Sequence, residues 1–263
     1  RDEKISSDVR NEYKTDGNFN KRLIPKDEML ELQKANHEVS RRHKYLTLPW
    51  VDRSFRILSS EAFFDYQKKM QEAIADFDVM AKKFSLKFGE LVAEAKRTDK
   101  SFKPEHYPSP DGIRGRFGAE IHYSPVPTGS DMRVTLSGNA VAAIKAAIDA
   151  DQQARIETAV ADIANRISET VGHLAKRLRE YKPATDDARA ENKFHDSLIT
   201  NVKELADLLP KINIVGDPKI DRMAANLAKL ADIEPYVLRS DVRERDRTAA
   251  AADKILQRVS SFI

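Results

Sequence analysis

Cysteine is absent from the 263 residues of this chain, and long apolar runs are absent as well. Without cysteine there is no disulfide framework, no thiolate zinc site, no iron–sulfur cluster and no cysteine nucleophile. No stretch of about eighteen consecutive apolar residues exists, so the sequence predicts no membrane-spanning helix. No apolar segment follows the N-terminus as in a signal peptide, and we therefore expect a cytoplasmic protein.

A strong excess of one charge is also lacking, because 45 basic residues face 42 acidic ones and the net charge is +3. Such a balance neither requires nor excludes a nucleic-acid partner, which a strongly basic chain would have indicated. Charged residues nevertheless make up 33% of the chain, above the average of roughly 25%. Together with the few aromatic residues, this favours long helices with wide solvated faces over a compact α/β enzyme.

The N-terminal quarter divides into two parts. Residues 1–24 are polar and charged and follow no period, so they predict a flexible arm. Residues 25–60 follow, with a helix that begins at Pro25 and runs to about Lys44, since proline suits the first helical turn. Alternation around Phe55-Arg56-Ile57 predicts a short strand at the end of this part.

Two long stretches carry apolar residues at alternating steps of three and four. In residues 61–97 these include Phe63, Tyr66, Met70, Phe77, Phe84, Phe88, Leu91 and Ala95. In residues 138–182 they are Val141, Ile144, Ile148, Ile156, Val160, Ile163, Ile167, Val171, Leu174, Leu178 and Tyr181. A mean step near 3.5 is the coiled-coil period. It predicts two helices each longer than about 25 residues, against a globular average of ~10–14.

Prolines and glycines interrupt the chain at 98–137, between the two long helices. Two short alternating runs in this insertion, Phe117–Tyr123 and Met132–Leu136, predict a β-hairpin with an irregular loop. After Pro183 the periodic apolar residues predict three further helices, ending at about Pro210, at about Leu230 and near Phe262. Residues 183–263 are therefore expected to form a C-terminal helical cap.

These segments predict a mainly α fold with long antiparallel coiled-coil-like helices. Residues 61–182 would form a stalk, with the β-hairpin inserted at its far end and the cap near its base. The alternative is an ordinary helical bundle in which the two helices only resemble a coiled coil. The stripe of Val160, Ile163, Ile167, Val171, Leu174 and Leu178 must be buried, and we expect a homo-oligomer if the first long helix covers only part of it.

Basic residues gather on either side of the break that follows the first long helix. The set is Lys96, Arg97, Lys100, Lys103, Arg114 and Arg116. In the stalk these six would meet at the hairpin end, where they are candidates for contact with a polyanion. Gly112-Ile113-Arg114-Gly115-Arg116 also resembles an anion-binding turn, although turns before strands often carry glycine and arginine without binding a ligand. Cations in a last helical turn also offset the helix dipole, which is a sufficient reason for several of the chain's basic clusters.

Recognisable catalytic patterns are missing. There is no phosphate-binding loop, no dinucleotide-binding glycine motif and no nucleophile elbow. The pairs Glu169 with His173, Glu191 with His195 and Glu120 with His122 have spacings that bring side chains together, but no third ligand accompanies any of them. The sequence therefore assigns no catalytic, cofactor-binding or metal-ligating residue, and predicts a protein that is not an enzyme.

Several short motifs occur along the second half of the chain and just before it: Tyr107-Pro108, Arg116-Phe117, Pro125-Val126-Pro127, Asp196-Ser197-Leu198, Leu208-Leu209-Pro210 and Gly216-Asp217-Pro218. Together they resemble an uncharacterised family of phage, plasmid and integrative-element proteins. The resemblance spans most of residues 25–263 and carries no established activity. Because such proteins are often encoded near MoxR-type AAA+ ATPases, it implies such an ATPase, or another mobile-element protein, as a partner, and the host-cell cytoplasm as location.

The preferred prediction is a non-enzymatic structural or adaptor protein of a phage or mobile element. It would associate with itself or with a partner through its long helices, without a membrane or a cofactor. The alternative is a sequence-independent nucleic-acid-binding protein of replication or recombination, whose binding would weaken with salt.

Overall fold

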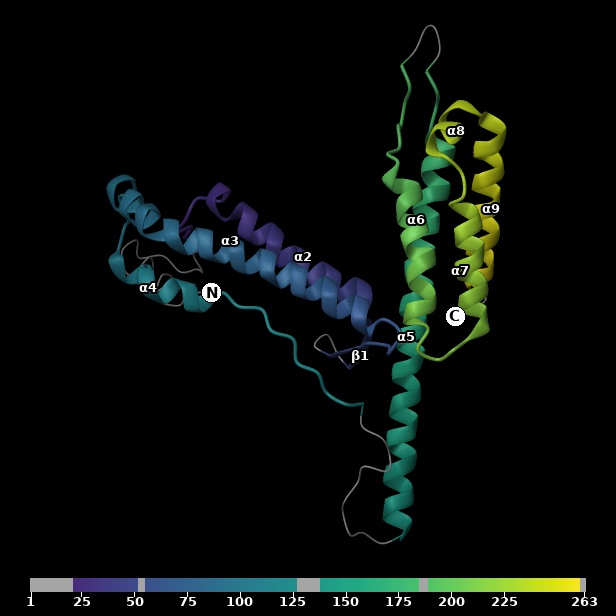
Figure 1. Ribbon diagram of the computed structural model, residues 1–263, viewed down its shortest axis with the longest axis horizontal. Coiled ribbons are helices and arrows are strands. Elements are labelled where there is room, and N and C mark those ends of the chain that lie inside the picture. The colour runs from purple at the N-terminus through teal and green to yellow at the C-terminus, as the bar shows by residue number, and fades with distance from the viewer. Residues whose placement is uncertain (1–20, 52–54, 127–137, 185–188, 261–263) are drawn as a thin grey trace, which may run out of the picture. The chain divides into compact units, whose positions relative to one another are not determined.

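The computed structural model describes residues 21–51, 55–126, 138–184 and 189–260, and it is mainly helical (Figure 1). The α-helices are α2 (Leu30–Leu46), α3 (Phe63–Thr98), α4 (Pro110–Ile113), α5 (Gly138–Glu180), α6 (Ser197–Leu208), α7 (Pro218–Leu230), α8 (Pro235–Ser240) and α9 (Val242–Ser260). Short 3-10 turns are η1 (Asp27–Met29), η2 (Pro104–His106), η3 (Arg114–Arg116) and η4 (Leu209–Ile212). The strands are β1 (Leu48–Val51) and β2 (Phe55–Ile57).

The two long helices predicted from the three-four spacing are confirmed. Helix α3 has 36 residues and α5 has 43. The chain divides into two compact units, of which unit 1 comprises Arg1–His43 with Tyr66–Ser124 and unit 2 comprises Lys44–Asp65 with Pro125–Ile263. Most of α3 thus belongs to unit 1 and α5 to unit 2, whereas the predicted stalk placed both helices in one body.

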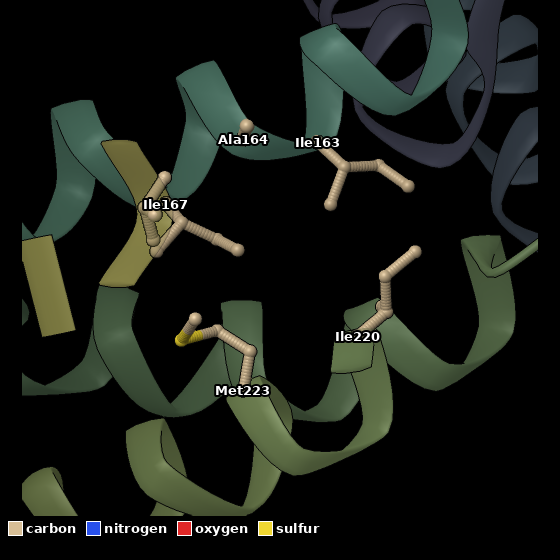
Figure 2. Close-up of a pocket in the computed structure, with 6 residues that line it drawn as sticks. Ile163, Ala164, Ile167, Ile220 and Met223 are labelled. Atoms are coloured by element: carbon tan, nitrogen blue, oxygen red, sulfur yellow. The ribbon is translucent and has the colours of Figure 1, made fainter. Parts of the chain in front are cut away.

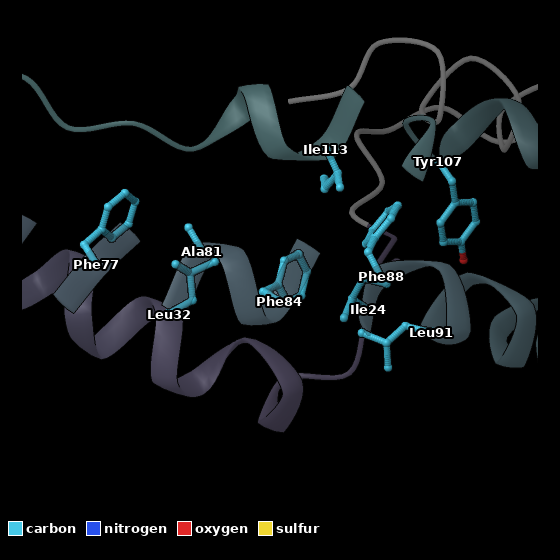
Figure 3. Packing of buried hydrophobic residues seen from close by; sticks show 9 residues of the cluster. All are labelled: Ile24, Leu32, Phe77, Ala81, Phe84, Phe88, Leu91, Tyr107 and Ile113. Atoms are coloured by element: carbon cyan, nitrogen blue, oxygen red, sulfur yellow. The ribbon is translucent and has the colours of Figure 1, made fainter. Parts of the chain in front are cut away.

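Unit 1 is built on the aromatic face of α3. Phe77, Ala81, Phe84, Phe88 and Leu91 are buried on this face. They pack with further buried residues from α2 and from the segments on either side of the α2–α3 pair: Ile24, Leu32, Tyr107 and Ile113 (Figure 3). Elements that are close to α3 in sequence therefore bury its aromatic face. The stalk prediction had assigned this role to the second long helix.

The end of the predicted N-terminal arm is part of this core. Ile24 is 8% exposed and Leu23 packs against the same cluster. Lys21 forms an ion pair with Asp99 at 2.9 Å. Residues 21–24 are thus held against unit 1, and residues 1–20 lie outside the described part of the chain.

The prediction of a β-hairpin in the insertion is wrong in position for the described residues. Residues Phe117–Tyr123 have no strand structure, and Met132–Leu136 lies outside the described residues. The rings of Phe117 and Phe84 meet edge to face with centroids 5.6 Å apart. The apolar residues of this run therefore pack on α3, and the alternation serves helix packing instead of strand pairing.

The antiparallel strand pair lies earlier, where one short strand was predicted. Strands β1 and β2 pair Leu48 with Ile57 and Pro49 with Arg56. This hairpin packs on α5 within unit 2. Arg166 of α5 donates to the main-chain oxygens of Tyr45 and Thr47, at 2.6 and 2.7 Å, and so joins the hairpin to the long helix.

The C-terminal half of α5 forms the centre of unit 2. Ile163, Ile167, Val171, Leu174 and Leu178 are all at most 3% exposed, and α9 and α6 pack along this helix. The predicted C-terminal cap is thus part of the same body as α5. Because these helices cover the stripe, the stripe itself is not available for the self-association predicted from it.

Candidate functional site: exposed cations of unit 1 and an exposed face of α5

The six predicted polyanion contacts all belong to described residues of unit 1. Lys96 and Arg97 lie in the last turn of α3, where they complement the negative end of the helix dipole. Lys96, Arg97, Lys100, Arg114 and Arg116 are exposed, and Lys103 is half-buried. The five exposed residues form no ion pair with the described part of the chain, so their charges face solvent.

A tight turn after α3 fixes the position of Lys100. The carboxylate of Asp99 accepts hydrogen bonds from the main-chain N–H and the hydroxyl of Ser101, at 2.8 and 2.7 Å. The ammonium group of Lys21 adds the ion pair at 2.9 Å. The Ser101 hydroxyl and Lys21 together lower the pKa of Asp99 to about 2. The carboxylate of Asp99 is therefore already engaged by Lys21 and Ser101, and little of its charge is left to offset the neighbouring exposed cations.

After this turn the chain folds back along α3, whereas the predicted stalk would have continued into a β-hairpin at its far end. Phe102 stacks on Tyr107 at 5.0 Å, and the Tyr107 hydroxyl donates to the carbonyl of Leu23 at 3.3 Å. Phe117 reaches Phe84, which precedes Lys96 by twelve residues, or ~18 Å of helix. Arg114 and Arg116 thus lie beside the middle of α3, and the six cations form two groups instead of one.

Gly112, the first glycine of the segment compared with an anion-binding turn, has a structural role. Gly112 lies in α4, and its N–H donates to the Ser109 hydroxyl at 3.0 Å, which caps this short helix. A Cβ on Gly112 would stand 2.8 Å from that hydroxyl oxygen, so the glycine has a structural reason. The Gly112 N–H is thus already bonded within the chain and is not free to hold an anion.

Arg114 and Arg116 are nevertheless held in a defined place. Ile113 and Phe117 flank them and pack toward α3, while both arginines between these anchors are exposed. A guanidinium presents a planar fork of donors that matches phosphate oxygens. The chemistry of both groups is thus contact with the backbone of a polyanion, without any feature that would read its sequence.

The structure shows contacts for residues of two other titratable pairs weighed from the sequence. His122 and Glu120 approach to 3.5 Å but are more than 80% exposed. Glu191 pairs with Lys182 at 2.8 Å, and its pKa is lowered by that hydrogen bond. Within the described segments, no group of three potential metal ligands occurs. No helix among those described is long and apolar enough to cross a bilayer.

A narrow apolar pocket lies inside unit 2 between α5, α7 and α9 (Figure 2). Its lining is Ile163, Ala164, Ile167, Ile220, Met223 and Val259. None of these side chains offers a strong hydrogen-bond donor or acceptor, which a specific ligand site needs in addition to apolar walls. The pocket is therefore a packing gap of the helical core.

The N-terminal half of α5 presents a different kind of surface. From Val141 to Thr158 no side chain is buried, and burial begins at Ala159. Figure 1 shows this half of the helix extending beyond α6, α7 and α9. Val141 is 39% exposed, and Ile144 and Ile148 are half-buried. The sequence identified these apolar residues, but it predicted self-association through the C-terminal half of the helix. Periodicity alone does not reveal which half of a long helix the other helices of the chain cover.

Comparison with known proteins gives no relative: no protein-family model, no curated sequence and no solved structure matches the chain. The resemblance to a mobile-element family therefore stays a hypothesis. The functional interpretation therefore rests on two surfaces, the exposed cations of unit 1 and the exposed N-terminal half of α5.

Proposed function

We propose that this chain is a non-enzymatic structural or adaptor protein that binds another protein through its long helices. The observation that carries the proposal is the exposed face of α5 between Val141 and Thr158. An extended helix with apolar residues at Val141, Ile144 and Ile148 is suited to receive a partner helix at i, i+3 and i+7 positions. This face runs on into the covered half of α5, so a bound helix would continue the packing of unit 2.

The biological context and the first partner in this proposal come from the sequence resemblance alone. It places the protein in a phage or mobile element, with a MoxR-type AAA+ ATPase as the first partner to test. Both are hypotheses that the α5 surface allows but does not specify.

The α5 surface can be tested with a matched pair of double variants. Ile144→Ser with Ile148→Ser removes the apolar stripe, and Gln153→Ser with Glu157→Ser changes two exposed residues that bond to each other at 3.1 Å. Titration calorimetry against the purified ATPase should show binding for the wild type and the second variant, and loss for the first. Equal binding by both variants would contradict the assignment of this surface.

The same variants should be compared for self-association by light scattering, because a second copy is the other partner of this kind. Circular dichroism provides the control for folding, since residues that are not buried contribute little to unit 2. If the isoleucine variant behaves like the wild type in both association assays, the α5 face is not a docking surface.

A second candidate function is sequence-independent binding of nucleic acid. The observation in its favour is the exposure of Lys96, Arg97, Lys100, Arg114 and Arg116, all within unit 1. Exposed cations that form no ion pair with described residues can neutralise phosphates and release counterions. The near-zero net charge of the whole chain limits the affinity, so this candidate stands second.

A further inference from the structure

Helix α3 carries a second row of regularly spaced residues on the side opposite its core, called here the outer seam. The residues at alternating steps of four and three are Ala75, Val79, Lys82, Leu86, Gly89, Ala93 and Lys96, and all seven are exposed. Leu86 is 77% exposed and Val79 is 49% exposed. The buried residues Phe77, Phe84 and Leu91 occupy the opposite face of the same turns (Figure 3). Two large apolar side chains, Val79 and Leu86, thus lie about two helical turns apart, with small residues and lysine stems along one face that the described part of the chain leaves uncovered.

Gly89, in the middle of this seam, has no steric reason within the described part of the chain. A Cβ placed on it would meet nothing within 4 Å, and its φ is not positive. Glycine inside a helix costs roughly 0.5–1 kcal/mol relative to alanine. A small residue at a seam position lets a second backbone approach or receives a large side chain from it.

The charges beside the seam indicate what the partner is. Asp76, Lys83, Glu90 and Arg97 follow one another at steps of seven, all are exposed, and none forms an ion pair with a described residue. The charges alternate in sign along the helix. When the order is reversed, as in an antiparallel copy, each charge therefore stands opposite one of the other sign. In an antiparallel helix pair this row faces the same row of the other copy. Asp76 then meets Arg97 of the second copy, and Lys83 meets Glu90 of the second copy.

We propose that unit 1 associates with a second copy of this chain through the outer seam of α3, in antiparallel orientation. The register that pairs the charges also places Leu86 of one copy over Gly89 of the other, which gives the glycine its role. Val79 and Ala93 lie near the lysine stems of Lys96 and Lys82 of the second copy, which can cover apolar surface while their ammonium groups stay in water. A parallel pair would not bring these four charges together.

The contact differs from the α5 surface of the proposed function and is tested by different residues. Lys83→Glu and Glu90→Lys should each weaken dimerisation about tenfold, ~1.4 kcal/mol, because each change breaks two symmetry-related ion pairs and creates repulsion. The double variant Lys83→Glu with Glu90→Lys should restore the wild-type affinity. Positions seven apart on one helix do not contact each other, so rescue can only act between copies.

Sedimentation equilibrium of the full chain and the three variants provides the measurement. A wild-type dimer, two weakened single variants and a restored double variant would support the proposal. A monomeric wild type at about 100 µM, well above a micromolar dissociation constant, would overturn it. A dimer that none of these changes affects would overturn it equally, because the contact would then lie elsewhere, including at α5.

The absence of cysteine allows a test of orientation. Asp76→Cys protein mixed with Arg97→Cys protein and mildly oxidised should give mainly the mixed disulfide, because these positions face each other only in the antiparallel register. Homodimeric disulfides of each variant in excess over the mixed product would indicate a parallel pair and contradict the proposal.

Discussion

Arg56 and Arg166 donate hydrogen bonds to the same main-chain oxygens. Arg56 reaches the carbonyls of Lys44 and Thr47 at 3.1 and 2.8 Å, and Arg166 reaches them at 2.9 and 2.7 Å. Asp162 bonds to Arg166 at 2.8 Å and offsets part of the repulsion between the two guanidinium groups. Burial and the neighbouring Arg166 lower the pKa of Arg56. Two cations are therefore held where the last carbonyls of α2 concentrate negative charge.

Removal of Arg166 should destabilise unit 2. Arg166→Ala leaves three main-chain carbonyls without this donor, and we expect the free energy of unfolding to fall by about 2–4 kcal/mol. Arg166→Lys should recover only a small part, because an ammonium group cannot span three carbonyls as a guanidinium does. Urea unfolding followed by circular dichroism measures the change.

Arg155→Ala is the matched control for this prediction. Arg155 also lies on α5 and donates to the same hairpin, but through one longer bond of 3.3 Å to the Trp50 carbonyl. Its removal should cost less than about 1 kcal/mol. Equal losses for Arg155→Ala and Arg166→Ala would contradict the special role of Arg166.

The link between Lys21, Asp99 and Ser101 should make unit 1 less stable in acid. The pKa of Asp99 is about 2 in the folded chain, below the ordinary value near 3.9. The folded state therefore binds fewer protons than the unfolded state in this range. The stabilisation is present above about pH 4 and is lost as the pH falls toward 2.

Asp99→Asn removes the titrating group and should give a shallower decline of melting temperature between pH 4 and 2 than the wild type shows. Melting curves at several pH values in this range measure it. Because the carboxylate is 30% exposed, salt should reduce the difference between the two proteins. Parallel declines for both proteins would show that Asp99 does not contribute.

The two groups of cations on unit 1 predict separable effects on nucleic acid. Arg114→Ala with Arg116→Ala should weaken binding to any single strand and reduce the salt slope by about one unit per lost phosphate contact. Lys96→Ala with Arg97→Ala should have an effect of similar size. Since the groups lie ~18 Å apart along α3, the quadruple variant should show the sum of both losses.

Fluorescence anisotropy on a labelled single strand at low and moderate salt provides the measurement. A wild type without salt-dependent binding near 50 mM salt would exclude the nucleic-acid candidate, since counterion release dominates such binding at low salt. Because Lys96 belongs to the outer seam of α3 and Arg97 to the charge row beside it, the variant that changes both should be checked for dimerisation before the two effects are compared.

The sequence predicted the helices well because their signals are local. The three-four period gave α3 and α5, and Pro183, Pro210 and Pro218 marked ends and starts near those observed. The partners of each helix were not predictable, because they depend on packing between distant segments. Thus Phe117 alternates like a strand residue but packs on Phe84.

The same limit applies to the candidate site. The sequence identified all six basic residues, and five of them are exposed, but their contact with a polyanion stays a prediction. Their division into two groups follows from the packing of Tyr107, Ile113 and Phe117 within unit 1, which joins residues distant in sequence. The outer seam of α3 could have been found from sequence by following the steps from Ala75 to Lys96, but the stronger aromatic period of the same helix obscured it.

Gly89→Ala should separate the stability of unit 1 from its self-association. In Lys83→Glu protein diluted below its raised dimer dissociation constant, alanine should raise the free energy of unfolding by roughly 0.5–1 kcal/mol, because it favours the helix and meets no described neighbour within 4 Å. In the chain without Lys83→Glu the same methyl group would stand where Leu86 of the second copy packs. Dimerisation should therefore weaken while the monomer becomes more stable. Urea unfolding and sedimentation equilibrium on the same preparations measure the two effects. A substitution that strengthened both, as expected for a simple gain in helix propensity, would remove Gly89 from the interface.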